Sequence, residues 1–351
     1  MNNETNITNN LIEKIKRKEV ITVKELLEAN IPKKKYLIKK LVPKGDITVI
    51  AARPGELKSL TAMYGSCCCA IGKPFLGRDT QKIKILYLDE ENNYPALSER
   101  FKKLTLGLER EPKDFENIKL LVFSAIKINT NEGREQLQQL VIKHSPNLVI
   151  IDCLIRVFTG DENSSKDMRL IFENLCQIIE KYGTTFLILH HVTKTKGRVT
   201  INAIRGSGDI IAAAASVLII NKNKQNNYSL SQVKSRHSAE LENELIFELV
   251  DFETEEGRGL KFNFIREKEL NKGNNTFALN AVENWCKENF TLNKGFKTGN
   301  VANFFPHLNG NDIRRILWEL VKKNVLLSTG KGKWININPN SNKENVNKWR
   351  K

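Results

Sequence analysis

The chain has 351 residues, of which 40% are hydrophobic and 27% charged, and its formal net charge is +16. This composition excludes a mostly disordered chain, and the longest apolar run, Ile210–Ile220, is about half as long as a membrane span requires. Because the polar start of the chain is unlike a signal peptide, we expect a cytoplasmic protein with no membrane partner. The surplus of Lys and Arg favours a polyanionic partner, although a Lys-rich solvated surface fits the same numbers.

Residues 1–45 are expected to form a lead-in with a short helix at Val23–Ala29 and a basic run at Lys33–Lys40. From residue 46 on, apolar β-branched runs alternate with segments of helical period. The expected strands are Ile47–Ala51, Ile83–Leu88, Leu120–Phe123, Leu148–Ile151, Thr185–Leu189 and Val217–Ile220. The expected helices are Leu60–Ile71, Tyr94–Leu106, Gly133–Lys143 and Ser165–Tyr182. This order predicts an α/β domain whose parallel sheet is covered by helices on both faces.

Two later runs, Tyr228–Lys234 and Leu245–Phe252, are close in sequence and are expected to pair antiparallel at the sheet edge. The α/β domain would then span residues 46–266. The polar, glycine-containing segment Glu267–Asn275 is expected to link it to a second domain.

Residues 276–337 have the pattern of a small winged helix-turn-helix domain, with three helices followed by a hairpin. These segments are the helices Phe277–Asn289, Thr298–Phe304 and Asn311–Lys323 and the strands Val325–Ser328 and Trp334–Ile337. The Asn- and Lys-rich tail, residues 338–351, is expected to be disordered.

Half of the positive surplus lies in Thr276–Lys351, which has 13 basic and 5 acidic residues. In a winged helix, basic residues on the third helix and on the hairpin can contact DNA. The candidate DNA-binding residues are Arg314, Arg315, Lys322, Lys323, Lys331 and Lys333. A solvated basic face, or a protein partner, fits the same pattern.

The first strand leads into a segment typical of a nucleotide-binding phosphate loop. The residues expected to bind ATP there are Arg53, Pro54, Gly55, Glu56, Leu57, Lys58, Ser59 and Leu60. Lys58 would reach the β- and γ-phosphate oxygens, and Ser59 would ligate Mg²⁺. The segment departs from G-x-x-x-x-G-K-[ST] at Ala52 and Leu57, where the standard motif has glycine, and a Leu57 side chain would crowd the backbone near the phosphates.

Three further strands end in polar residues, at the edge where α/β sheets bind ligands. Asp152 completes a Walker-B pattern and would hold Mg²⁺ through water. Glu90 or Glu91 could orient the water that attacks the γ-phosphate. His190 and His191 end another strand, where a polar group could sense the γ-phosphate. A solvated acidic turn and a structural histidine pair are the simpler alternatives.

The six cysteines include no C-x-x-C pair, so zinc is not expected. Cys67, Cys68 and Cys69 lie in an apolar helical stretch and are expected to be buried core residues. Metal binding by the histidine pair would need further ligands, which the sequence does not reveal.

Together these segments resemble the RecA-fold ATPases of the plasmid RepA-type replicative helicases, within the wider RecA/DnaB group. The resemblance extends from about Leu26 to Phe252. It rests on Ala52–Ser59, Gly72–Arg78, Leu86–Asn92, Leu148–Asp152, Gly160–Asn163, His190–Lys194 and Arg205–Ser207.

The resemblance implies a RecA-like twisted sheet and a homo-oligomeric ring, expected to be a hexamer, with ATP bound between subunits. By position, Glu91 corresponds to the catalytic glutamate, with Glu90 as the alternative. Asp152 corresponds to the Walker-B aspartate and His191 to the γ-phosphate sensor.

The resemblance also implies a cation that acts on the neighbouring subunit's site. Lys234 and Arg236 match the K-x-R element of DnaB-like motors, and Arg205 is the rival candidate. Either would stabilise transition-state charge. A pair of solvated bases on an edge strand is the alternative for Lys234 and Arg236.

The expected function is therefore a Mg²⁺-dependent, DNA-stimulated ATPase that acts as a ring-forming DNA helicase of a plasmid, virus or other mobile element. An ATP-gated DNA-binding regulator, or a non-catalytic replication scaffold or loader with a degenerate phosphate loop, also fits. The chain keeps Lys58, Ser59, Glu91 and Asp152, which favours an active enzyme.

Overall fold

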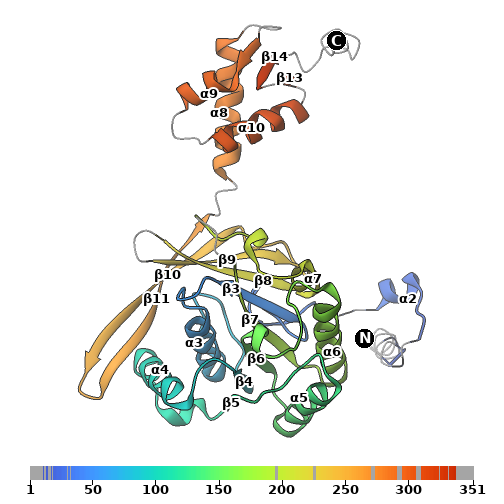
Figure 1. Ribbon diagram of the computed structural model, residues 1–351, viewed down its shortest axis with the longest axis vertical. Coiled ribbons are helices and arrows are strands. Elements are labelled where there is room, and N and C mark those ends of the chain that lie inside the picture. The colour runs from blue at the N-terminus through green and yellow to red at the C-terminus, as the bar shows by residue number, and fades with distance from the viewer. Residues whose placement is uncertain are drawn as a thin grey trace. The chain divides into compact units, whose positions relative to one another are not determined.

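The computed structural model divides the chain into two compact units, Met1–Glu267 and Lys268–Lys351, which are described separately (Figure 1). The residues described are 11, 13–14, 17, 19–29, 31, 33–193, 197–223, 227–269, 273–290, 295–305, 310–323, 325–330 and 332–336. The start of the chain before residue 11 and the predicted tail, residues 338–351, lie outside them.

The first unit is built on a nine-stranded sheet in the order β11-β10-β9-β8-β3-β7-β6-β4-β5. The strands are β3 (Ile47–Ala52), β4 (Ile85–Asp89), β5 (Ile118–Val122), β6 (Leu148–Asp152), β7 (Thr185–His191), β8 (Ser216–Lys222), β9 (Tyr228–Ser235), β10 (Asn243–Thr254) and β11 (Gly257–Glu269). All pairings from β8 to β5 are parallel, and β9 pairs antiparallel with β8 and with β10. The predicted mostly parallel sheet with antiparallel strands at one edge is confirmed.

Helices cover both faces of this sheet. α3 (Lys58–Ile71) and α4 (Tyr94–Leu108) lie on one face, and α5 (Asn131–His144), α6 (Ser165–Tyr182) and α7 (Gly208–Ala213) lie on the other (Figure 1). Each layer packs on its own buried apolar cluster. The strands contribute side chains to both clusters because successive side chains point to opposite faces of the sheet. Since both faces are buried, the strand sequences are almost continuously apolar. Cys67, Cys68 and Cys69 of α3 are fully buried in the first cluster, as predicted.

Shorter elements complete the first unit. They are α2 (Val23–Glu28), the paired strands β1 (Tyr36–Ile38) and β2 (Val42–Pro43), and the 3₁₀ helices η1 (Pro112–Phe115), η2 (Leu154–Arg156) and η3 (Ile201–Ala203). Thr22 and Glu25 form a capping box that fixes where α2 begins. Among the helices of the described residues, none is long and apolar enough to cross a membrane.

The elements that the sequence did not predict include α7 and β11. The apolar run Ile210–Ile220 is divided between α7, which ends at Ala213, and β8, which begins at Ser216. β11 is the second, and its signal is weak: Leu260 and Phe262 are buried, whereas the intervening and flanking residues are mostly exposed and polar. β11 continues to Glu269 and α8 begins at Gly273, so both elements extend into the range of the predicted linker.

The second unit contains α8 (Gly273–Asn289), β12 (Gly295–Lys297), α9 (Thr298–Phe304), α10 (Gly310–Lys322), β13 (Leu326–Gly330) and β14 (Lys333–Asn336). Its three strands form an antiparallel sheet in the order β12-β14-β13. α10 buries Ile313, Ile316, Leu317 and Leu320 in a separate core, the face that their helical spacing predicts. Trp334 of β14 is buried in the same core.

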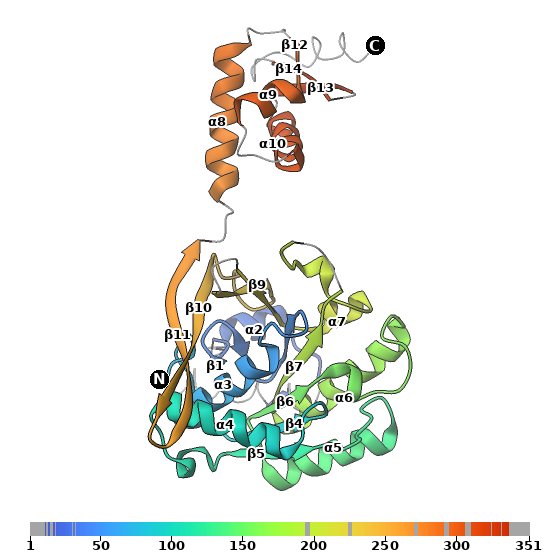
Figure 2. The same cartoon turned by 60° about the vertical axis from the view of Figure 1, so that its left-hand side comes forward.

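The β10–β11 hairpin is a long twisted ribbon that passes beside α4 (Figure 2). The contact is very close at Gly107, where an added Cβ would lie 1.8 Å from the carbonyl oxygen of Leu260. A backbone atom cannot rotate away as a side chain can, so α4 and β11 can approach this closely only with glycine at position 107.

We expect Gly107→Ala to lower the free energy of unfolding by about 3 kcal/mol, because α4 and β11 must separate to admit the methyl group. Gly208→Ala is the matched control, since an added Cβ at Gly208 meets nothing within 4 Å. Urea denaturation of both variants measures the effect. Equal stabilities would show that the hairpin does not pack on α4 as described.

Candidate active site

The candidate site lies at the carboxyl ends of four adjacent parallel strands, β3, β7, β6 and β4. Their register places Ala52 opposite His191 and Asp89 opposite Asp152, so the polar strand ends meet at one edge. A cavity of about 550 Å³ opens there. Its walls include every predicted ATP-binding residue except Glu56.

The phosphate loop adopts its turn in spite of the two missing glycines. Ala52 lies within β3 and is fully buried. Leu57, the residue before α3, has a φ of 62°, and Gly55 has a φ of 78°. Leu57 therefore takes the left-handed conformation for which the standard motif uses glycine. Its side chain cannot accept a hydrogen bond, which leaves the first N–H groups of α3 available to phosphate oxygens.

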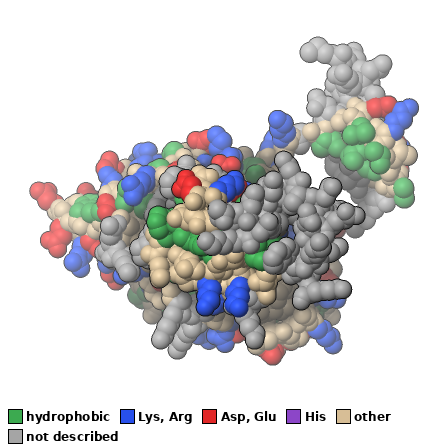
Figure 3. Space-filling view, turned by 90° about the horizontal axis from the view of Figure 1, so that it is seen from above, with side chains coloured by type: hydrophobic (Ala, Val, Ile, Leu, Met, Phe, Trp, Pro, Cys, Tyr) green, Lys and Arg blue, Asp and Glu red, His purple; other side chains and the backbone are tan. Residues whose placement is uncertain are grey.

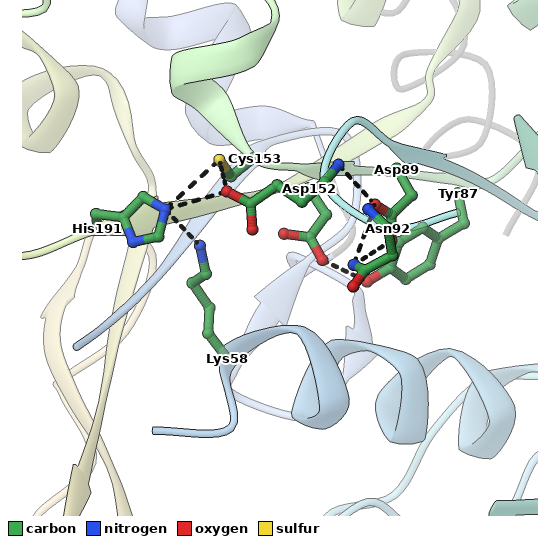
Figure 4. A network of polar contacts seen from close by, with 8 residues as sticks. Lys58, Tyr87, Asp89, Asn92, Asp152, Cys153 and His191 are labelled. Atoms are coloured by element: carbon green, nitrogen blue, oxygen red, sulfur yellow. Dashed lines mark hydrogen bonds and ion pairs between the residues drawn. The ribbon is translucent and has the colours of Figure 1, made fainter. Parts of the chain in front are cut away.

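Lys58 begins α3 and joins a polar network that is centred on His191 (Figure 4). Its Nζ lies 3.5 Å from His191 Nε2, which lies 3.3 Å from Glu91 Oε1. The Cys153 thiol donates to the same Glu91 oxygen over 2.9 Å. The hydrogen bond from His191, together with that from Cys153 and the charge of Lys58, lowers the pKa of Glu91 to about 2 despite partial burial. Glu91 is therefore ionised at neutral pH.

The geometry distinguishes the two candidate carboxylates. Glu90 accepts hydrogen bonds from the backbone N–H and the hydroxyl of Ser124, beyond β5, so its carboxylate is already bound. Glu91 faces Lys58 instead. Asp89 fixes the backbone from which the Glu91 side chain extends, because its Oδ1 accepts hydrogen bonds from the backbone N–H groups of Glu91 over 2.9 Å and of Asn92 over 2.7 Å.

Asp152 ends β6 and is fully buried. The Tyr87 hydroxyl donates to Oδ2 over 3.1 Å, whereas Oδ1 has no hydrogen-bond partner among the described residues. Burial raises the pKa of Asp152 to about 6, although Lys58 and the Ser59 hydroxyl favour its ionised form. A buried carboxylate oxygen without a partner, beside a hydroxyl, fits the hard oxygen ligands that Mg²⁺ prefers. Ser59 and Asp152 are thus suited to the predicted metal role.

The two neighbouring histidines have different surroundings. His191 faces the cavity. His190 is buried, and its Nε2–H donates to the backbone carbonyl of Arg205 over 2.6 Å. Burial lowers the pKa of His190 to about 4, so it is neutral at physiological pH. Of the pair, only His191 is placed to act on a phosphate.

Lys234 and Arg236 lie near the amino ends of the parallel strands, opposite to the candidate site. Ser235 pairs with Ser216 at the start of β8, and β8 runs parallel to β3, so these residues are near the end at which β3 begins. The Lys234 ammonium and the Arg236 guanidinium both donate to the carbonyl of Ala212, over 2.9 Å and 2.7 Å, at the end of α7. Burial and the nearby Arg236 lower the pKa of Lys234. Neither cation reaches the phosphate loop of its own chain.

Arg205 joins two segments on which the family resemblance rests. Its guanidinium forms an ion pair with Glu162, which is buried. The backbones of the two segments are also in direct contact. The Ser207 N–H donates to the Glu162 carbonyl over 2.8 Å, and a Cβ on Gly206 would lie 2.7 Å from that oxygen. The Gly160–Asn163 and Arg205–Ser207 segments therefore form one structural unit.

Several residues at the site carried no sequence signal. Arg100 and Lys103 of α4 and Asp251 of the β10–β11 hairpin line the cavity. These side chains line the cavity because elements distant in the sequence pack together, and no local sequence motif predicts such packing. Cys153 directly follows Asp152, and without a second cysteine nearby in the sequence no ligand pattern marks it.

The predicted DNA-binding residues lie in the second unit. Arg314 and Arg315 of α10, together with Lys323 and Lys333, are exposed. Lys322 is exposed and paired with Glu319 over 2.8 Å. Lys331 lies outside the described residues.

A protein-family model described as an AAA domain matches residues 13–197, more than half of the chain. The match contains β3, β4, β6 and β7, and with them Lys58, Glu91, Asp152 and His191. No curated protein matches the sequence.

The backbone at Leu57 predicts which substitutions the loop accepts. A β-branched side chain is strongly disfavoured at positive φ, whereas glycine is not. We expect Leu57→Ile to weaken Mg–ADP binding about tenfold, a cost of about 1.4 kcal/mol, and Leu57→Gly to leave it within about threefold of wild type. Isothermal titration calorimetry measures both. Wild-type affinity in the isomeric Ile variant would contradict the left-handed assignment.

The raised pKa of Asp152 means that the native state holds this proton more tightly than the unfolded state does. The associated stability is present below about pH 4 and is lost as the pH rises through about 6. The Asp152→Asn variant has no titrating group at this position, so it does not lose this stability as the pH rises. Its free energy of unfolding minus that of wild type should therefore rise between pH 4 and pH 8, by about 1–3 kcal/mol. Urea denaturation with a metal chelator present measures the difference, and a value independent of pH would refute the assignment.

Proposed function

The chain belongs to the AAA domain family, and on this premise we propose that it is a Mg²⁺-dependent ATPase that works as a DNA-stimulated, ring-forming motor. An AAA domain is a P-loop ATPase domain, so nucleotide-dependent activity follows from the family itself. The observation that carries the proposal is the meeting of Lys58, Ser59, Asp152, Glu91 and His191 at one edge of the sheet.

Hydrolysis would proceed by in-line attack of water on the γ-phosphorus, with cleavage of its bond to the oxygen that bridges to the β-phosphate. Ionised Glu91 orients the attacking water and accepts hydrogen bonds from it. Lys58, 6% exposed at the helix start, neutralises charge on the phosphate oxygens. Ser59 and Asp152 would hold Mg²⁺, which when bound would supply further charge neutralisation.

Motor action needs a connection from the γ-phosphate to a segment that can contact DNA. His191 has such a connection, because its backbone carbonyl accepts the Arg205 N–H over 3.3 Å, and the adjacent His190 donates to the Arg205 carbonyl. Arg53 of the phosphate loop also contacts the carbonyl of Gly197. The stretch from Thr193 to Gly208, which in RepA-type helicases could face DNA in the ring channel, is thus tied to the site at three points.

The ring part of the proposal rests on the resemblance to RepA-type replicative helicases, and a hexamer is the expected state. The positions of Lys234 and Arg236 support it. A cation at the edge of the sheet away from its own phosphate loop is available to a neighbouring subunit's site, whereas it has no catalytic use within its own chain.

The second unit supports DNA binding. We propose that it is a winged helix, because its three helices and three-stranded sheet, with the β13–β14 hairpin following α10, have that order of elements. The exposed Arg314 and Arg315 would then contact phosphates. On the face in Figure 3, the coloured Lys and Arg side chains are interspersed with Asp and Glu.

A non-catalytic scaffold, or an ATP-gated DNA-binding regulator, is the second candidate. The observation that favours it is Leu57, since a side chain at the left-handed position narrows the space in which the loop backbone approaches the phosphates. Such a protein would bind nucleotide and DNA without turnover.

Steady-state ATP hydrolysis with Mg²⁺, with and without single-stranded DNA, separates these functions. We expect DNA to stimulate turnover, and Lys58→Ala and Glu91→Gln each to reduce it at least about 100-fold. Glu90→Gln is the matched control and should retain turnover within about fivefold, because Ser124 binds that carboxylate away from the site. Absence of wild-type turnover in a folded, nucleotide-binding protein would favour the scaffold or regulator. Loss of activity in Glu90→Gln alone would exchange the roles of the two glutamates.

A further inference from the structure

Three potential metal ligands converge within the candidate site. Glu91 follows β4, Cys153 follows β6 and His191 ends β7, and these strands are adjacent in the sheet. One ligand atom from each lies within 4.8 Å of the other two. The three ligand residues lie up to 100 positions apart in the sequence, so no short motif could predict that they cluster.

The distances between the ligand atoms match a tetrahedral zinc site. Zn–S, Zn–N and Zn–O bonds of about 2.3, 2.05 and 2.0 Å, at tetrahedral angles, separate S from N by about 3.6 Å, S from O by about 3.5 Å and N from O by about 3.3 Å. Here Cys153 Sγ is 3.7 Å from His191 Nε2 and 2.9 Å from Glu91 Oε1, and the last two atoms are 3.3 Å apart. Only the S to O distance must lengthen appreciably, from 2.9 Å to about 3.5 Å.

We propose that Glu91, Cys153 and His191 form a site for a thiophilic divalent cation, Zn²⁺ foremost, which holds the ATPase in a reversibly inhibited state. The Cys153 S–H proton is released to solvent as the Zn–S bond forms, His191 coordinates through Nε2 with its proton on Nδ1, and Glu91 coordinates as the carboxylate. The two anionic ligands balance the charge of the cation. The fourth tetrahedral position is left to water.

Access and charge are compatible with this site. Cys153 is fully buried, but the side chains of Glu91 and His191 are 28% and 24% exposed and line the cavity, so a cation reaches the thiol between them. The Lys58 ammonium, 3.5 Å from His191 Nε2, must swing away. Its long unbranched stem permits this movement, and a charge-balanced metal site repels it less than a bare cation would.

Inhibition rests on the proposed ATPase function, because the cation would occupy Glu91 and His191, the groups assigned to water and to the γ-phosphate. Mg²⁺ would not substitute for it. Mg²⁺ demands octahedral oxygen ligands, whereas thiolate and imidazole together select zinc or cobalt. The two cations would therefore use different residues of one cavity.

Metal binding is tested without reference to activity. Chelator-treated, nucleotide-free full-length protein is titrated with Co²⁺, and Zn²⁺ affinity is measured by competition with a chromogenic chelator. We expect one equivalent of Co²⁺ to give a thiolate charge-transfer band and intense visible bands of tetrahedral cobalt, both abolished by Zn²⁺. Cys153→Ser should remove the charge-transfer band and weaken Zn²⁺ binding at least about tenfold. Cys176→Ser, which changes an exposed cysteine, should alter neither.

A charge-transfer band that survives in Cys153→Ser, or its absence from wild type, would overturn the site. A melting curve of Cys153→Ser verifies that the variant is folded, and His191→Gln gives a second test by the same spectrum. Inhibition is tested separately at buffered free Zn²⁺ with excess Mg–ATP: wild-type turnover should fall at least tenfold and recover when the metal is chelated. Cobalt binding without inhibition would refute the regulatory role alone, whereas an inactive wild type that still binds cobalt would refute the proposed ATPase and leave the site standing.

Discussion

The parallel pairing of β3, β7, β6 and β4 is the constraint on which the candidate site depends. Each strand delivers one chemical group at or just beyond its carboxyl end, and parallel register brings those ends to the same edge. A slip of one residue in any pairing would move each side chain into the cluster on the opposite face, where it would not fit the existing packing, so the close packing of both clusters holds the register. The apolar packing of the sheet therefore also determines the distances between Lys58, His191, Asp152 and Glu91.

At the carboxyl ends of these strands, the surroundings of Glu91 and Asp152 shift the pKa values of the two carboxylates in opposite directions. Glu91 is partly open to the cavity and receives hydrogen bonds, so its pKa falls to about 2, whereas burial raises that of Asp152 to about 6. Carboxylates whose pKa values are driven apart are typical of sites in which each has a separate role. Buried Asp152 lowers the stability of the domain at neutral pH, a cost that a cation bound at its Oδ1 would offset.

Much of the fold could be predicted from the sequence, because strands buried on both faces are continuous apolar runs and the intervening helices are amphipathic. α6 begins and ends at Ser165 and Tyr182, as predicted. β11 was missed because just Leu260 and Phe262 mark its buried face. The sequence favoured Glu91 over Glu90 only through the family resemblance, because the physical difference between them depends on Ser124, which β5 brings beside the end of β4. Cys153 as a ligand depends in the same way on strands that are neighbours only in the folded sheet.

The direction of the strands also bears on which cation could act between subunits of the proposed ring. Arg205 would have to leave Glu162, a carboxylate that is 7% exposed. Because the Arg205 side chain is half exposed, the cost lies between the about 1 kcal/mol of a surface pair and the about 3–5 kcal/mol of a fully buried one. Arg236 would lose a hydrogen bond to the carbonyl of Ala212, worth about 1 kcal/mol net. It also lies away from its own phosphate loop, so charge that it stabilises at a phosphate must belong to another chain. On both grounds Arg236 is better suited than Arg205 to act on a neighbouring site in the proposed ring.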